Sequence, residues 1–209
     1  LYDLTTLQRD ANRLLGYTAQ QTLDYLQNLY EKKLCTYPRT DSRYLTSDMA
    51  ESLPVLVNLV ANVMPFRKGI AISCDAAQVI NDKKVTDHHA VIPTRNLQDA
   101  DLSGLPVGEK AVLELVALRL LCAVAQPYTF AETAVVVECA GAEFTAKGRT
   151  VKQPGWRALD AAYRAGLKNV EPETEDKALP ELSEGQTLPF SGAAVKEGKT
   201  TPPKHFTED

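Results

Sequence analysis

The stretch Thr36-Tyr37-Pro38-Arg39-Thr40-Asp41-Ser42 says more about fold and function than any other part of the chain. Proline disfavours the helical region for the residue before it, so Tyr37 is expected to have an extended backbone. Side chains two positions apart in an extended segment project to the same face. The sequence therefore places the phenol of Tyr37 and the guanidinium of Arg39 side by side.

This pair has a plain chemical meaning. A phenol is a possible nucleophile, and a guanidinium matches the oxygens of a phosphate group. Together they suit attack on a phosphodiester. The alternative is a half-buried tyrosine with a satisfied hydroxyl beside a surface arginine, and for either residue taken singly that alternative is favoured.

The surrounding sequence decides between these two interpretations. Residues 30–45 resemble the active-site segment of type IA DNA topoisomerases, especially the topoisomerase III branch. A motif match is a hypothesis, but here five matches follow the family in order and spacing. The other four are residues 4–12, 87–94, 154–157 and 201–208.

The resemblance implies a catalytic role for Tyr37 and Arg39. Tyr37 would attack a backbone phosphate of single-stranded DNA, leaving a 5′-phosphotyrosine and a free 3′-hydroxyl. A phenol has a pKa of about 10, so it must lose its proton during the attack. Arg39 would stabilise the charge that gathers on the phosphate oxygens, which makes its loss worth roughly 10²–10³ in rate. Tyr44 is the next candidate nucleophile if Tyr37 is not the one.

Four other residues are candidates for DNA binding. His88 matches the first histidine of the family's His-x-Ala-x-x-Pro stretch, which the resemblance places near the active site. Arg43 and Thr94 are candidates for phosphate contacts, although as solvated surface residues they would need no explanation. Asp41 could orient Arg39 or carry a proton; equally, Asp41 or Ser42 could cap a turn.

No metal site is predicted within the chain. Asp87-His88-His89 could hold a metal, but adjacent histidines rarely face the same way, and His89 receives no catalytic role. The resemblance implies Mg²⁺ held by an acidic domain, and residues 1–209 contain no such cluster. We therefore expect a piece of a longer polypeptide, inactive alone, that lacks the metal-binding and ring-closing domains. The missing initiator methionine agrees with this expectation.

Composition bounds the remaining possibilities. The 209 residues are 44% hydrophobic and 24% charged, as in a soluble globular protein, and no run is long enough to span a membrane. The net charge of −4 gives no sign of a nucleic-acid partner. The four scattered cysteines predict reduced thiols in a cytoplasmic protein, with Cys122 and Cys139 in the core. A monomer is expected, and the acidic stretch 170–177 is expected to be an exposed loop.

Two capping-box patterns predict the first helices. Thr5-x-x-Gln8 opens one that ends at Gly16, and Thr18-x-x-Gln21 opens another that ends near Lys32. The expected inward residues are Leu7, Ala11 and Leu14 in the first helix, and Ala19, Leu23, Leu26 and Tyr30 in the second.

Further helices are predicted in the middle of the chain. Residues 47–63 should be divided by Pro54, with Ser52 capping the second piece. A short helix is expected at 75–80. The stretch 109–125 is apolar on all sides, which is typical of a buried helix.

The pattern changes after Pro127. Residues 129–140 alternate with period two, and Gly141 turns the chain into a second strand near 143–149. A short helix at 156–164 and another strand at 186–196 are expected to follow.

These elements predict an α+β fold. The resemblance implies that residues 1–127 form a helical, winged-helix (catabolite-activator-like) domain carrying the tyrosine, with the first few residues assigned to it or to the arch. Residues 128–209 would be part of a β-rich arch. A non-catalytic winged-helix DNA-binding module is the alternative, but it requires a basic recognition helix and leaves the pairing of Tyr37 with Arg39 unexplained. A plain interaction domain explains none of the five motifs.

Overall fold

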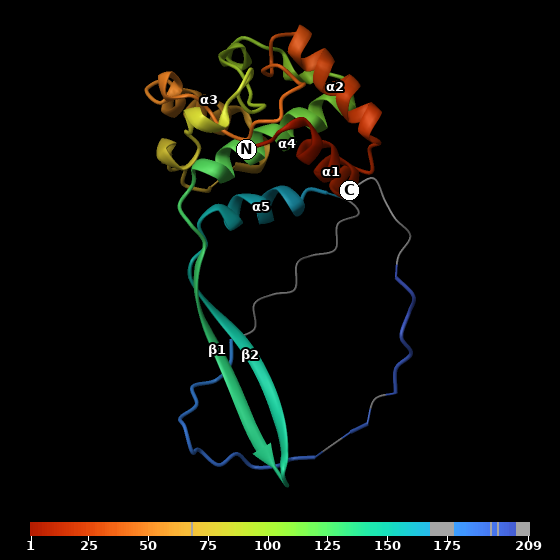
Figure 1. The fold of residues 1–209 in the computed structure, drawn as a ribbon, viewed down its shortest axis with the longest axis vertical. Helices are drawn as coiled ribbons and strands as arrows, with labels where there is room; N and C mark the ends of the chain where they lie inside the picture. The colour runs from red at the N-terminus through yellow and green to blue at the C-terminus, as the bar shows by residue number, and fades with distance from the viewer. Residues whose placement is uncertain (68, 168–177, 193, 196, 204–209) are drawn as a thin grey trace. The chain divides into compact units, whose positions relative to one another are not determined.

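The computed structural model describes residues 1–67, 69–167, 178–192, 194–195 and 197–203. In these residues the chain forms five α-helices and one antiparallel hairpin of two strands, which confirms the α+β class (Figure 1). They divide into two compact units. The first unit holds residues 1–129 and the chain from Lys152 through the last helix, and the second holds Phe130–Val151 and the described residues beyond 177. The winged-helix and arch identities stay predictions.

The first unit is helical. Its α-helices are α1 (Leu4–Leu15), α2 (Ala19–Glu31), α3 (Leu53–Val63), α4 (Val107–Val124) and α5 (Trp156–Arg164). Short 3-10 helices lie between α2 and α4, at Ser47–Met49, Pro65–Arg67, Ala76–Gln78, Asp82–Lys84, Arg95–Gln98 and Leu102–Gly104.

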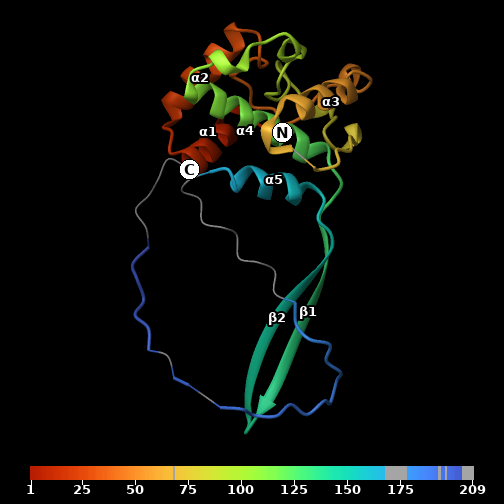
Figure 2. The same ribbon diagram turned by 180° about the vertical axis from the view of Figure 1, so that it is seen from behind.

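Helix α4 is the centre of this unit. It contacts α1, α2, α3 and α5, and both views of the ribbon place it among them (Figure 1 and Figure 2). Its sequence is apolar all round, and residues on every side of it are buried, which confirms the prediction for 109–125. The fully buried side chains around it include Leu26 and Leu29 of α2, Val57 and Val60 of α3, and Leu159 of α5.

The start of α2 matches the sequence prediction and the start of α1 does not. Thr18 and Gln21 form the reciprocal capping box, with both hydrogen bonds present. In α1 the N-cap is Asp3, whose carboxylate accepts from the backbone N–H of Thr6. Thr5 is therefore inside the helix, because an aspartate two residues earlier caps it first. Gly16 ends α1 in the left-handed conformation, as predicted.

The buried face of α2 differs from the predicted one. The buried residues are Thr22, Leu26 and Leu29, and Tyr30 is 39% exposed. The predicted inward residue Leu26 is completely buried and Ala19 and Leu23 are partly buried, so the prediction is wrong only for Tyr30. Tyr30 therefore lies at the surface on the last turn of α2.

Two predictions about the middle of the chain are corrected. Pro54 does divide 47–63 into a 3-10 helix and α3, and Ser52 occupies the N-cap position of α3, but its hydroxyl donates to the carbonyl of Met49 and makes no capping hydrogen bond. The predicted helix at 75–80 is a 3-10 helix, Ala76–Gln78, capped by Asp75.

The hairpin consists of β1 (Thr129–Cys139) and β2 (Ala142–Gln153). The turn residues Ala140 and Gly141 have φ of 52° and 81°, the positive values that a tight two-residue hairpin turn needs. The described residues of 186–196 form no strand, so that prediction is wrong. The acidic stretch 170–177 lies outside the described residues.

All four cysteines lie in the described part of the chain and are free thiols. Burial raises the pKa of Cys35 to about 12, so its thiol stays protonated. Cys122 is partly buried, and Cys139 is exposed, contrary to its predicted place in a core, since both faces of β1 near its end are open. Among the described residues no helix is both long and apolar enough to cross a membrane.

Candidate functional site

The segment around Tyr37 is extended, and its burial alternates with period two. Pro38, Thr40 and Ser42 are buried, whereas Arg39 and Asp41 are exposed. Tyr37 itself is half-buried. Alternating burial is typical of an extended chain lying on a core, so Tyr37 and Arg39 share the outward face, as the proline predicts.

Hydroxyl groups on the inward face attach this segment to the loop that carries His88. The hydroxyl of Thr40 donates to the carbonyl of His88 over 2.8 Å, and the hydroxyl of Ser42 donates to the carbonyl of Lys84 over 2.8 Å. Thr36 exchanges hydrogen bonds with the backbone of Ala90 and Ile92. Sequence reasoning missed Thr36 and Thr40, and gave Ser42 at most a turn. The sequence contained a signal for this attachment, because hydroxyl residues recur at every second position on the face that Pro38 shares.

These attachments bring three rings together. The ring of Tyr37 lies 4.3 Å from that of His88, centroid to centroid, and 5.5 Å from that of Tyr30. The contact with Tyr30 is edge-to-face, at 82° between the planes. Within the described part of the chain, the hydroxyl of Tyr37 makes no hydrogen bond. The sequence pointed to His88 through its motif but missed Tyr30.

Arg39 and Asp41 lie next to Tyr37 on the outward face. Among the described residues, neither side chain makes a hydrogen bond or an ion pair. The guanidinium of Arg39 therefore has its five donors free for a ligand. The idea that Asp41 orients Arg39 finds no contact here.

Arg43 and Thr94 are engaged within the protein. Arg43 donates to Asp3 over 2.8 Å and to the hydroxyl of Thr6 over 2.6 Å. The hydroxyl of Thr94 donates to the carbonyl of Lys33 and accepts weakly from the N–H of Asn96. A phosphate contact by either residue would compete with these hydrogen bonds, and their DNA-binding roles stay predictions.

Tyr44, the alternative nucleophile, has a different environment from Tyr37. Its hydroxyl accepts a hydrogen bond from the ammonium of Lys84 over 3.3 Å, and Lys84 also lies 4.7 Å from the centre of its ring. His89 points its Nδ1 at the carbonyl of its neighbour Ala90, over 2.8 Å. It makes no ring contact with Tyr37 among the described residues.

The residues that the structure describes offer no group that fits a metal ion. In the described residues no three side chains of His, Cys, Asp or Glu come close enough together to hold one. Asp87, His88 and His89 are adjacent in the chain without forming such a group.

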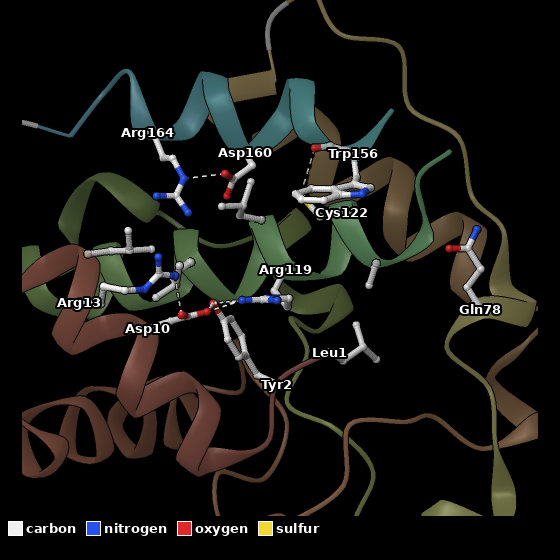
Figure 3. Close-up of a pocket in the computed structure, with 14 residues that line it drawn as sticks. Leu1, Tyr2, Asp10, Arg13, Gln78, Arg119, Cys122, Trp156, Asp160 and Arg164 are labelled. Carbon is white, nitrogen blue, oxygen red and sulfur yellow. Dashed lines mark hydrogen bonds and ion pairs between the residues drawn. The ribbon is translucent and has the colours of Figure 1, made fainter. Parts of the chain in front are cut away.

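A pocket of about 490 Å³ opens elsewhere in the first unit, between α1, α4 and α5 (Figure 3). Its lining includes Tyr2, Asp10, Arg119, Trp156 and none of the residues around Tyr37. The charges within it are paired with one another, as the dashed lines of the figure mark. The pairs are Arg13 with Asp10, Arg119 with Asp10, and Arg164 with Asp160.

Tyr2, which is buried, and Asp10, which is partly buried, form the centre of this network. The hydroxyl of Tyr2 donates to Asp10 over 2.7 Å and accepts from Arg119 over 3.1 Å, and Arg119 also lies 4.4 Å from the centre of the Tyr2 ring. Burial raises the pKa of Tyr2 far above its usual value. Burial alone would raise the pKa of Asp10, but hydrogen bonds from Tyr2 and Arg13 and the charge of Arg119 hold it below its usual value. This network is satisfied and structural.

Comparison with known proteins gives a consistent answer. The family model described as DNA topoisomerase matches residues 1–209. The chain is 41% identical over 218 residues to DNA topoisomerase 3 of Bacillus subtilis and 39% identical over 214 residues to that of Bacillus licheniformis. A third relative, DNA topoisomerase 3 of Shouchella clausii, is 40% identical over 215 residues. Each match covers the whole of this chain, which spans only 28–29% of the length of these relatives.

Proposed function

Because this chain belongs to the bacterial type IA DNA topoisomerases, in the DNA topoisomerase 3 branch, we propose that it carries the nucleophile that cuts and reseals single-stranded DNA. The phenol oxygen of Tyr37 attacks a backbone phosphorus and forms a 5′-phosphotyrosine. The bond from phosphorus to the 3′ oxygen breaks, and that oxygen leaves as a free hydroxyl after gaining the proton that the phenol gives up. One phosphodiester replaces another, so resealing is the reverse step and needs no ATP.

The observation that carries the proposal is the state of the Tyr37 hydroxyl. It makes no hydrogen bond to any described residue, although its ring is half-buried and held by two other rings. The hydroxyls of Tyr2 and Tyr44, in contrast, are bound within the protein. A hydroxyl held in place without a partner is available to a substrate.

Arg39 supplies the charge that the reaction needs. In the transition state negative charge gathers on the non-bridging phosphate oxygens, and a planar fork of donors stabilises them. Arg39 is on the same face as Tyr37, is exposed, and has no partner among the described residues. His88, in contact with the Tyr37 ring, would add a second group to the phosphate or exchange a proton with it.

The finer parts of the proposal concern the whole enzyme. A tyrosine-bearing winged-helix domain would occupy 1–127, followed by part of an arch domain in 128–209. Mg²⁺ would be held by residues outside 1–209, as the resemblance to the family implies. The partner would be single-stranded DNA, in a monomeric cytoplasmic enzyme, and the isolated chain would be inactive.

The test is covalent trapping in the full-length protein that carries residues 1–209. It is mixed with an end-labelled single-stranded oligonucleotide and Mg²⁺, denatured, and run on a gel that reports protein-linked DNA. Tyr37→Phe keeps the packing of the ring and removes the attacking oxygen, so no adduct should form. Tyr44→Phe is the matched control and should still form it.

Two results would contradict the assignment. An adduct in the Tyr37→Phe protein would move the search to Tyr44. Loss of the adduct in Tyr44→Phe alone would do the same.

A further inference from the structure

The ring of Tyr37 is held from two sides by rings that come from different parts of the chain. Tyr30 lies on the last turn of α2, and His88 lies in the loop before Ala90. Since the hydroxyl of Tyr37 makes no hydrogen bond to a described residue, no polar contact fixes its direction. The orientation of the phenol therefore depends on its ring contacts.

At the end of α2 the backbone reverses direction and hydrogen-bonds back to the last turn, which carries Tyr30. Lys33 has φ of 59°, in the left-handed region, and its N–H donates to the carbonyl of Tyr30 over 2.8 Å. The N–H of Leu34 donates to the carbonyl of Leu29, also over 2.8 Å. These two bonds form a Schellman motif, which reverses the chain at the helix end. Thr94 and Asn96 both donate to the carbonyl of Lys33, and these hydrogen bonds stabilise the reversed backbone.

Tyr30 itself contributes little to the core. Tyr30 is 39% exposed, while Leu26 and Leu29 on the same helix are completely buried. Tyr30 makes no side-chain hydrogen bond to a described residue. What it does contact is Tyr37, at an angle and distance typical of a favourable aromatic pair.

We propose that Tyr30 is a positioning residue for Tyr37: its ring restricts the Tyr37 phenol to the orientation from which the oxygen meets the phosphorus. This inference rests on the proposed function of Tyr37. Tyr30 acts through the ring and not through its hydroxyl, and it takes no part in the chemistry. Loss of the contact leaves Tyr37 free to sample other rotamers, so fewer bound molecules have the reacting atoms aligned.

The experiment measures binding and chemistry separately in the full-length protein. Binding to a labelled single-stranded oligonucleotide gives Kd, and single-turnover adduct formation at saturating protein gives the rate of cleavage. For Tyr30→Leu we expect a rate about tenfold lower at unchanged Kd, because an aromatic pair is worth about that factor. Tyr30→Phe retains the ring and should cleave at the rate of the unaltered protein.

Tyr25→Leu is the matched control on the same helix. Tyr25 makes an edge-to-face contact of 5.3 Å with Tyr17 and lies against the start of α4, where Gly108 leaves room for its ring. This change should lower the urea midpoint of unfolding more than Tyr30→Leu does, with no change in the cleavage rate of the folded protein. If Tyr30 had a purely structural role, Tyr30→Leu would lower the urea midpoint more than Tyr25→Leu does.

Each other outcome overturns the proposal in a recognisable way. Cleavage at full rate by Tyr30→Leu means that the contact is incidental. Equal losses in Tyr30→Phe and Tyr30→Leu mean that the hydroxyl matters, and a raised Kd with an unchanged saturated rate makes Tyr30 a DNA contact. All three presuppose that Tyr37→Phe abolishes the adduct; if it does not, the proposed function fails first.

Discussion

Tyr2 and Tyr37 each belong to a tyrosine–arginine pair in the first unit, and the two pairs differ in what satisfies them. Tyr2 is 1% exposed, and its hydroxyl is bound by Asp10 and Arg119. Tyr37 is half-buried, and neither its hydroxyl nor the guanidinium of Arg39 has a partner among the described residues. The same two residue types are thus hydrogen-bonded within the protein at Tyr2 and unpaired among the described residues at Tyr37.

The difference shows that two tyrosine–arginine pairs of one protein can differ in whether their polar groups are already bound within the fold. Burial raises the pKa of Tyr2 far above its usual value, so it stays a neutral donor to Asp10. A satisfied buried network stabilises the fold, and an exposed unpaired arginine contributes little to stability. Variants at the two pairs should therefore separate activity from stability.

The largest effect is expected from replacing Arg39 by lysine. Arg39→Lys keeps the charge but loses the planar fork, so adduct formation in the full-length protein should slow roughly 10²–10³-fold. Its urea midpoint should not change, because Arg39 has no partner to lose among the described residues. Single-turnover cleavage and equilibrium unfolding measure the two quantities.

Arg119→Lys is the corresponding change at the hydrogen-bonded pair of Tyr2 and Arg119. It should lower the free energy of unfolding by about 1 kcal/mol, through the weakened hydrogen bonds to Tyr2 and Asp10, and leave cleavage by the folded protein unchanged. The proposed difference between the two pairs is wrong if Arg39→Lys unfolds the protein, or if Arg119→Lys slows cleavage as much as Arg39→Lys does.

The next effect concerns the two aspartates. Asp10 binds Tyr2, Arg13 and Arg119, and its side chain is 13% exposed. Asp10→Asn should lower the free energy of unfolding by about 2 kcal/mol, below the 3–5 kcal/mol of fully buried pairs because both arginines are partly exposed. Asp41→Asn, at an exposed site without a described partner, should stay within about 0.5 kcal/mol of the unaltered protein. Equal losses would show that the two regions are not distinct.

Local patterns in the sequence predict the helices well where one segment contains the whole signal. The capping box at Thr18 and Gln21, the all-apolar stretch of α4 and the bounds of α5 are of this kind. The prediction fails where a neighbour competes, as Asp3 does with Thr5 for the start of α1. It also fails at 186–196, where a pattern typical of a strand finds no partner strand among the described residues.

The candidate site depends on contacts that no local pattern contains. The sequence predicts that Tyr37 and Arg39 share a face, because Pro38 fixes the backbone between them. That the ring of His88 lies on Tyr37 follows from hydrogen bonds between segments far apart in the chain, through Thr40 and its neighbours. The place of Tyr30 depends on how α2 ends, and the end of α2 depends in turn on Thr94 and Asn96.

A smaller effect should appear when stability is measured against pH. The folded-state pKa of Asp10 is lowered, so its contribution is fully present above the unfolded-state pKa of about 3.9 and is lost as the pH falls through the folded value. Unfolding midpoints between pH 7 and pH 2 should therefore fall less steeply in Asp10→Asn than in the unaltered protein. An unchanged slope in Asp10→Asn would mean that the network does not hold that carboxylate charged.

The smallest effect comes from the turn that leads into the Tyr37 segment. Lys33 has φ of 59° and Gly16, at the end of α1, has φ of 71°. The left-handed region costs a residue with a side chain about 1 kcal/mol and costs glycine almost nothing, so Lys33→Gly should raise the free energy of unfolding by about 0.5 kcal/mol after the extra entropy of the unfolded chain. Gly16→Ala should lower it by about 1 kcal/mol, since nothing within 4 Å of the added Cβ obstructs it and only the backbone strain acts. Urea midpoints measure both changes.

If the left-handed turn only reverses the chain, Lys33→Gly keeps the cleavage rate of the full-length protein. A slower rate in this more stable variant would show that the rigidity of the turn holds Tyr30 against Tyr37.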